Sequence, residues 1–188
     1  MHIEINCSFF GHRNAELTKT EYNILYKYLE TLVSDNKSIT FLLGSRSNFN
    51  TICHNIVTEL KVKYPHIKRI SYTCRSECSI LESERLHWSK ILSKQENKEI
   101  NILGVEEEYD HAKKYISGRA SYIIRNQAII DASDICIFYY DDTYRPPLRK
   151  RSKNSISKYQ PNSGTALSYK YALSKKKTII NIKNINSM

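Results

Sequence analysis

The chain has 188 residues, a formal net charge of +10, 40% hydrophobic residues and 26% charged residues. This length and balance predict one domain over residues 1–188 with a substantial core. No apolar run in the sequence approaches the roughly 20 residues that a membrane span needs, which excludes a membrane-spanning helix. The positive charge favours anionic partners, whether nucleotide, phosphate or nucleic acid, without separating them.

The cysteines bear on disulfide and metal sites, and the first residues bear on the location of the protein. The five cysteines are Cys7, Cys53, Cys74, Cys78 and Cys136. Only one pair is closely spaced, and no second pair completes a four-ligand zinc site. We therefore expect buried reduced thiols, no disulfide framework and no metal. The opening MHIEINCSFF has no basic leader and no cleavage-site signature, so we expect a cytoplasmic location.

The first part of the chain alternates between strand-like and helix-like patterns. Its predicted strands cover 2–10, 38–44 and 68–74, and its predicted helices cover 17–36 and 51–64. The first helix has an apolar stripe at Leu25, Leu29, Leu32 and Val33. Thr18 and Glu21 form a capping box at its start. Pro65 ends the second helix, because the residue before proline avoids helical geometry.

The alternation continues to the end of the chain. We expect a helix or ordered loop over 76–98, a short strand over 99–104, helix over 106–133 with a break at 117–118, a strand over 134–141, a helix over about 165–175 and a strand over 177–182. Short apolar strands separated by helices are typical of a parallel sheet covered on both faces. The predicted fold class is therefore α/β, a Rossmann-like three-layer sandwich with a mainly parallel central sheet.

A basic flap or loop lies at about 142–162, where the sequence has no apolar periodicity. Its cations are Arg145, Arg149, Lys150, Arg151, Lys153 and Lys158. Long loops inside a compact domain are uncommon and are often functional. Either this segment is a solvated insertion, or it covers an anionic ligand.

Candidate ligand-binding residues follow the predicted strands, because ligands of open parallel sheets bind at the carboxyl ends of the strands. These residues are Gly11, His12, Arg13, Gly44, Ser45, Arg46 and Asp141, with Ser163, Gly164 and Thr165 before the last helix. Glycine lets the backbone approach a phosphate, a helix N-terminus attracts it, and arginine supplies forked donors. The plainer interpretation of the Ser-Gly-Thr turn is an N-cap.

Arg125 and Asn126 lie in an otherwise apolar helix. A charged residue there either reaches out to solvent along its aliphatic stem or points into a site. His12, at a strand end, could act as a base, but no partner for it can be identified from the sequence. No catalytic residue can be assigned.

Four stretches, in this order, resemble the YpsA-like branch of the SLOG superfamily. They are CSFFGHR (7–13), LLGSRSNFNTIC (42–53), YIIRNQAIIDASDICIFYYD (122–141) and NSGTALSYKYA (162–172). That superfamily groups the Smf/DprA and LOG proteins, which share a Rossmann-like nucleotide-binding domain. The resemblance covers residues 3–182, approximately, and depends on the ordered set of motifs.

The resemblance implies a pocket for a nucleotide or nucleotide-derived ligand. It puts Gly44, Ser45 and residues 163–165 on the phosphate side, and also matches residues 11–13 and 125–126 to family motifs. The turn after the second predicted strand departs from the family pattern, because Asn48 and Asn50 stand where the family has a glycine and an acidic residue.

A second departure concerns catalysis. LOG enzymes hydrolyse nucleoside monophosphates to base and ribose phosphate, and carry a glutamate where this chain has Ser168. A serine cannot replace a carboxylate that stabilises a developing cation or activates water. LOG-type hydrolysis is therefore not expected, although Arg125 matches that family's arginine.

The expected function is binding of a nucleotide-derived ligand, ADP-ribose-like or a cyclic nucleotide signal, by a sensor or scavenger without clear catalysis. One alternative is a nucleotide-processing enzyme, N-glycosidase- or phosphoribohydrolase-like, that uses Asp131, Asp141 or Glu77 in place of the glutamate. Another is a single-stranded nucleic-acid binder of the DprA type, with bases stacked on tyrosines in a basic groove. A homo-oligomer stays open, and no membrane partner is expected.

Overall fold

The computed structural model describes residues 4–44, 47–74, 107–110 (backbone only), 119–151, 154, 156, 158–159 and 161–183. Its elements are β1 (Ile5–Gly11), α1 (Lys19–Asp35), β2 (Ile39–Leu43), α2 (Asn48–Lys63), β3 (Ile67–Thr73), β4 (Glu107–Asp110), α5 (Arg119–Ala132), β5 (Ile135–Tyr139), β6 (Arg149–Lys150), β7 (Lys158–Tyr159), α6 (Gly164–Ser174) and β8 (Thr178–Asn181). None of the described helices is long and apolar enough to cross a membrane.

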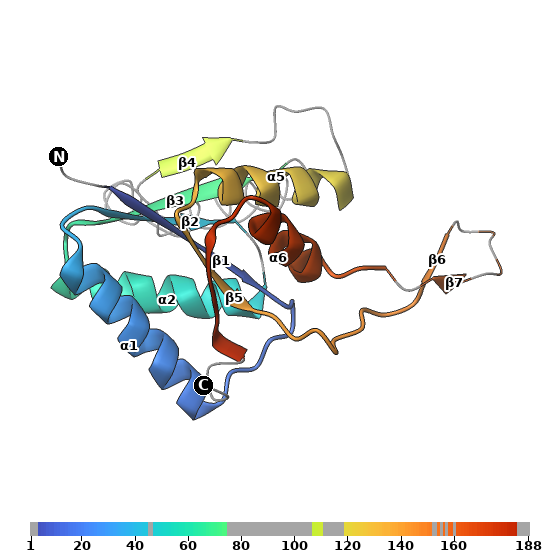
Figure 1. Cartoon of the computed structure of the whole chain (residues 1–188), viewed down its shortest axis with the longest axis horizontal. Coiled ribbons are helices and arrows are strands. Elements are labelled where there is room, and N and C mark those ends of the chain that lie inside the picture. The colour runs from blue at the N-terminus through green and yellow to red at the C-terminus, as the bar shows by residue number, and fades with distance from the viewer. Residues whose placement is uncertain are drawn as a thin grey trace, which may run out of the picture.

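The central layer is a six-stranded sheet in the order β4-β3-β2-β1-β5-β8. Every neighbouring pair of strands in it is parallel. Helices α1 and α2 lie on one side of the sheet, and α5 and α6 lie on the other (Figure 1). The predicted Rossmann-like three-layer α/β sandwich is therefore confirmed.

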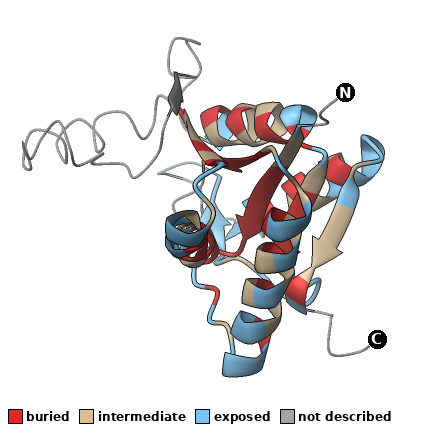
Figure 2. Cartoon of the chain, turned by 90° about the vertical axis from the view of Figure 1, so that its left-hand side faces the viewer, coloured by how far each residue is buried: buried red, intermediate tan, exposed pale blue. Residues whose placement is uncertain are grey.

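Two hydrophobic clusters fill the spaces between the layers. Successive strand residues point to opposite faces, so Phe9 belongs to the cluster under α1 and α2, whereas Phe10 belongs to the cluster under α5 and α6. Phe9 stacks on Phe41 of β2, and Phe10 stacks on Phe138 of β5. Figure 2 shows the buried residues concentrated in the central strands. Cys7, Cys53 and Cys136 are buried free thiols, as expected, and Cys74 is buried as well.

Local side-chain caps set the starts of three helices. The predicted capping box is present: Thr18 Oγ1 accepts from Glu21 N at 3.2 Å, and Glu21 Oε2 accepts from Thr18 N at 2.8 Å. Ser47 caps α2 by accepting from Asn50 N, and Ser163 caps α6 by accepting from Ala166 N. Each cap satisfies an N–H group that the helix itself leaves without an acceptor.

Two predictions for secondary structure were wrong in detail. Helix α2 begins at Asn48 rather than at residue 51, because Ser47 caps it. Residues 107–110 form strand β4, although they lie in the segment 106–133 that was predicted as helical. Strand β4 pairs with β3, and such pairing with a distant segment can override local helical preference. The segment 142–162 contains the antiparallel hairpin β6–β7. The elements predicted at 76–98 and 99–104, and the break at 117–118, lie outside the described residues.

Gly11 ends β1 directly under α2. A Cβ atom at this position would lie 2.3 Å from Cβ of Phe49 and 2.6 Å from its Cγ. Phe49 is fully buried, so it cannot move away without disturbing the core. At Gly164, by contrast, an added Cβ meets no atom within 4 Å.

Gly11→Ala should therefore lower the free energy of unfolding by about 1–3 kcal/mol, because it overpacks the contact with Phe49. The matched control Gly164→Ala should change that free energy by less than about 0.5 kcal/mol. Urea denaturation followed by circular dichroism measures both values. Equal stabilities of the two variants would contradict the packing role of Gly11.

Candidate functional site

The candidate site lies at the point where the sheet reverses its strand order. From β1 the chain builds outward through β2, β3 and β4, and it then returns to place β5 on the other side of β1. Gly11 at the end of β1 pairs with Tyr139 at the end of β5. Connections leave these two ends in opposite directions, which opens a crevice where ligands of such sheets bind.

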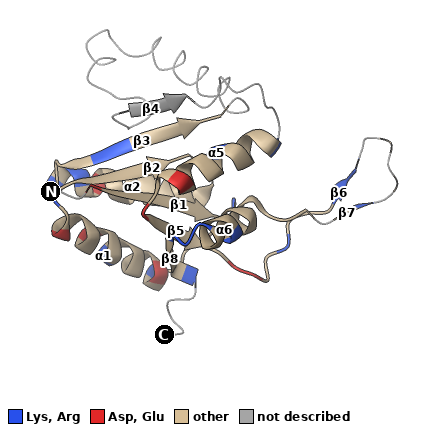
Figure 3. Cartoon of the chain, turned by 45° about the horizontal axis from the view of Figure 1, so that its top comes forward, with Lys and Arg blue, Asp and Glu red and all other residues tan. Residues whose placement is uncertain are grey.

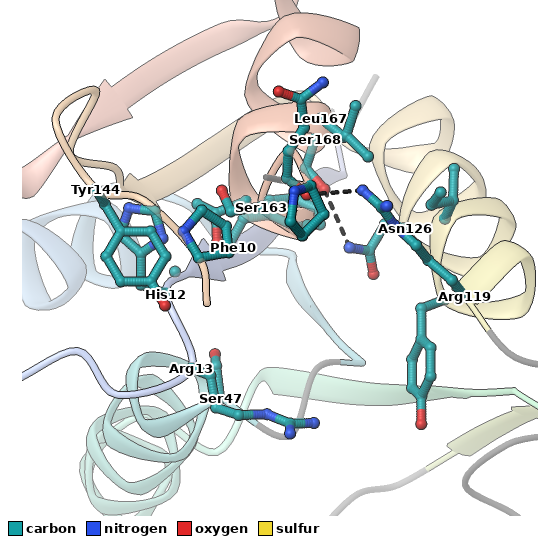
Figure 4. A pocket seen from close by; sticks show the side chains of 18 of the residues that line it. Phe10, His12, Arg13, Ser47, Arg119, Asn126, Tyr144, Ser163, Leu167 and Ser168 are labelled. Carbon is teal, nitrogen blue, oxygen red and sulfur yellow. Dashed lines mark hydrogen bonds between the residues drawn. The ribbon is translucent and has the colours of Figure 1, made fainter. Parts of the chain in front are cut away.

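A pocket of about 880 Å³ occupies this position (Figure 4). Its wall is built from the turn after β1, the N-terminal part of α5, the segment after β5 and the start of α6. Eight of the predicted site residues line it: Gly11, His12, Arg13, Arg125, Asn126, Ser163, Gly164 and Thr165. Residues distant in the sequence were thus correctly expected to lie together.

Two other predicted residues, Gly44 and Asp141, are not among the described residues that line the pocket. Gly44 lies against α5, where an added Cβ would be 2.4 Å from Ile129 Cδ1 and 2.9 Å from Arg125 Cδ. Gly44 therefore makes room for the side chain of Arg125. Asp141 uses its carboxylate to accept from the backbone N–H and the hydroxyl of Thr143, which lowers its pKa. Ser45 and Arg46 lie outside the described residues.

The N-terminus of α6 opens into the pocket. The Ser163 hydroxyl accepts from Ala166 N at 3.0 Å, so the plain capping interpretation of this residue is correct. The N–H groups of Gly164 and Thr165 open the helix and have no intrahelical acceptor. Gly164 is exposed, with free space around its Cα. The turn therefore combines a cap with a positive dipole end that an anion can approach closely.

A buried polar chain crosses from β3 to α6 through α5. Arg125, only 2% exposed, donates from Nε to Asn126 Oδ1 at 2.9 Å and from Nη1 to the Tyr72 carbonyl at 3.3 Å. Asn126 donates from Nδ2 to Ser168 Oγ at 3.0 Å, as a dashed line in Figure 4 marks. The Arg125 guanidinium also lies 5.7 Å from the ring centre of Tyr122. These contacts hold a positive charge in the pocket wall.

His12 is held in one neutral form at the other end of the pocket. The Asp141 N–H donates to His12 Nε2 at 3.1 Å, which assigns the ring proton to Nδ1. Nδ1 is buried and has no hydrogen-bond partner in the described part of the chain. The ring packs against Tyr144, with centres 4.1 Å apart (Figure 4). Burial lowers the pKa of His12, and the nearby Asp141 carboxylate partly opposes that shift.

The charge of the pocket has one sign. Its described lining contains Arg13, Arg119, Arg125, Arg149 and Lys170 and no Asp or Glu. Arg119 Nη2 donates to the Asn162 carbonyl at 2.7 Å, which fixes that guanidinium beside the start of α6. Several cations without a carboxylate create a positive potential that favours an anionic ligand. In the described part of the chain, no group of His, Cys, Asp and Glu could hold a metal ion.

Sequence reasoning missed several lining residues, and some of them had a signal. Arg119 and Tyr122 lie seven and four residues before Asn126, so helical spacing puts all three on one face of α5. Counting back from Asn126 by the helical period would therefore have identified Tyr122 and Arg119 as candidate site residues. Tyr144 and Arg149 had no such signal, because they come from a segment without periodicity.

The burial of neutral His12 makes stability depend on pH. Its folded-state pKa lies below the ordinary value of 6.5, so the unfolded chain binds this proton more tightly. The contribution of neutral His12 to the free energy of unfolding is fully present above the ordinary pKa of 6.5 and is lost as the pH falls towards the folded-state pKa. Wild type should therefore lose more free energy of unfolding than His12→Gln between about pH 7.5 and 5. Urea denaturation at several pH values measures the difference, and parallel pH profiles would refute it.

Neither a scan against models of protein families nor a search of curated proteins returned a match to this chain. The resemblance to the SLOG superfamily therefore stays a prediction that depends on four short motifs. The conclusion about the site comes from its own geometry: a cationic pocket at the switch point of a Rossmann-like sheet.

Proposed function

We propose that this pocket binds a nucleotide or nucleotide-derived ligand through its phosphate groups, as the resemblance to SLOG domains implies. The observation that carries the proposal is the described lining, which has four arginines, one lysine and no carboxylate. The start of α6 adds N–H donors and the positive end of the helix dipole. A volume of about 880 Å³ is large enough for a nucleotide.

Aromatic side chains offer a place for the rest of the ligand. Tyr122, Tyr144 and Tyr171 line the pocket together with the cations. A base has a flat face that stacks on such rings. Two neutral hydrogen-bonding groups, Asn126 and Ser168, also line the pocket and can orient a base or ribose. The combination of cationic, aromatic and neutral polar groups favours a nucleotide over inorganic phosphate alone.

The same lining favours binding over hydrolysis. Ser168, which stands where LOG enzymes carry glutamate, accepts from Asn126 and supplies no carboxylate. The only lone pair on the neutral His12 ring, at Nε2, already accepts from the Asp141 N–H, so His12 is not poised as a general base. The Asp131 carboxylate accepts a hydrogen bond from the Tyr171 hydroxyl and forms an ion pair with Lys175. The Asp141 carboxylate accepts from the Thr143 N–H. We therefore propose a sensor or scavenger of the ligand.

Mass spectrometry of small molecules released from the purified protein would identify a co-purified ligand. A thermal-shift series would then compare AMP, NAD, ADP-ribose and a cyclic dinucleotide with adenosine. A true ligand at about 100 times its dissociation constant stabilises the fold by about 2.7 kcal/mol. Phosphate-bearing compounds should raise the melting temperature and adenosine should not. If no member of the series shifts the melting temperature, the proposal fails.

Gly164→Asp should weaken binding of the phosphate-bearing ligand by about tenfold or more, because it puts a negative charge where the phosphate approaches. The fold should tolerate the change, since aspartate in the first turn of a helix is favourable. Gly164→Ala is the matched control, which adds a Cβ without charge. Isothermal titration calorimetry measures all three proteins. Unchanged affinity in Gly164→Asp would remove the start of α6 from the site.

A further inference from the structure

The net positive charge of this protein comes from the C-terminal part of its sequence. Residues 143–188 contain eleven Lys and Arg and no Asp or Glu, so the rest of the chain is close to neutral. The hairpin β6–β7 lies at the beginning of this segment. We use the name hairpin arm for β6, β7 and the flanking Arg145 and Arg151.

The hairpin arm stands away from the three layers of the fold (Figures 1 and 3). Neither hydrophobic cluster includes a residue of it. Its cations Arg145, Arg149, Lys150, Arg151 and Lys158 are all exposed. Because the arm adds nothing to the described core, packing inside this chain does not account for its composition.

The pairing within the arm opposes like charges. Lys150 lies directly opposite Lys158, and Arg149 lies directly opposite Tyr159. Like charges at directly opposed positions destabilise an antiparallel pair, and a two-stranded hairpin is only marginally stable by itself. The sequence from residue 143 onward offers no carboxylate to relieve the repulsion. An external chain of negative charges would relieve it.

The two faces of the hairpin differ in what they offer. Opposed residues share a face, so Arg149 and Tyr159 lie on one face of the hairpin and the two lysines lie on the other. Arg149 also lines the pocket, so this face continues the pocket's positive surface. A guanidinium beside an exposed ring can bind a phosphate and stack a neighbouring base.

The apolar residues near the arm do not form a membrane-binding patch. Ile156, which is 97% exposed, lies beyond the tip end of the paired strands, and exposed Leu148 lies at the base end. The cations lie between them. A segment that inserts into a bilayer instead gathers its apolar side chains on one face.

We propose that the hairpin arm binds the phosphate backbone of a single-stranded nucleic acid, with Tyr159 stacking on an unpaired base. The single strand is favoured because its bases are accessible to the ring, whereas those of a duplex are stacked inside. This surface adjoins the nucleotide pocket and shares Arg149 with it, whereas Lys150, Lys158 and Tyr159 are not among the described residues that line the pocket. A test on the two lysines is therefore separate from a test of the pocket.

Fluorescence anisotropy of a labelled 20-nucleotide oligothymidine tests the proposal on the full-length chain. Lys150→Gln with Lys158→Gln should weaken binding about tenfold at low salt. It should also reduce the slope of log affinity against log salt by about 1.4, because each lysine that neutralises a phosphate of a single strand accounts for about 0.7. The matched control, Lys27→Gln with Lys37→Gln, removes the same charge from exposed positions on and just after α1 and should bind like wild type.

Three further measurements decide between this proposal and its competitors. Equal reductions of affinity in the arm variant and the control would show a general charge effect and overturn the proposal, as would equal affinity for a duplex of the same length. Arm-dependent binding to phosphatidylserine vesicles without binding to the oligonucleotide would also overturn it. Gly164→Asp separates the two sites, because it should impair nucleotide binding and leave the contribution of the two arm lysines intact.

Discussion

The parallel pairing of β1 with β5 is the constraint on which the rest of the site depends. This pair joins Gly11 to Tyr139 at the carboxyl edge of the sheet and makes the chain leave these two ends in opposite directions. The turn that contains His12 and the segment that begins at Asp141 are therefore neighbours, and one hydrogen bond links them. The pocket lies over this junction because the connections from the two strand ends go to opposite sides of the sheet and leave a crevice between them.

Arg125 shows how the fold keeps a charge where a ligand can use it. Removing a guanidinium from water is costly unless other polar groups replace its hydration. Here the Tyr72 carbonyl and the Asn126 amide oxygen do so, and Gly44 leaves space for the aliphatic part of the side chain. Since these partners belong to separate elements, the arginine also ties β3 and α5 together, and Asn126 continues the link to α6. A preorganised cation of this kind needs little rearrangement when an anion binds.

The features that could be predicted from the sequence are those set by interactions between residues close together in the chain. The start of α1 depends on Thr18 and Glu21, three residues apart, and the strands depend on apolar runs, so both were found locally. Strand β4 exists through its pairing with β3, a segment more than thirty residues earlier, and its acidic sequence carries no strand signal. The hairpin β6–β7 likewise has paired strands of only two residues. The strand-end rule brought most site residues together, but it could not give the buried network of Arg125 or the stacking of Tyr144 on His12.

The uneven charge along the chain also has a consequence for the kinetics of association. The chain is nearly neutral up to residue 142 and carries eleven cations after it, and five of these cations lie at exposed positions of the hairpin arm. In the field of an approaching anion such a molecule experiences a torque, which turns its positive side forward before contact. Oriented encounters of this kind raise association rates, and salt suppresses the effect as the Debye length shortens. The arm and the start of α6 both belong to this segment, so an anionic ligand of the proposed kind would approach in the same field.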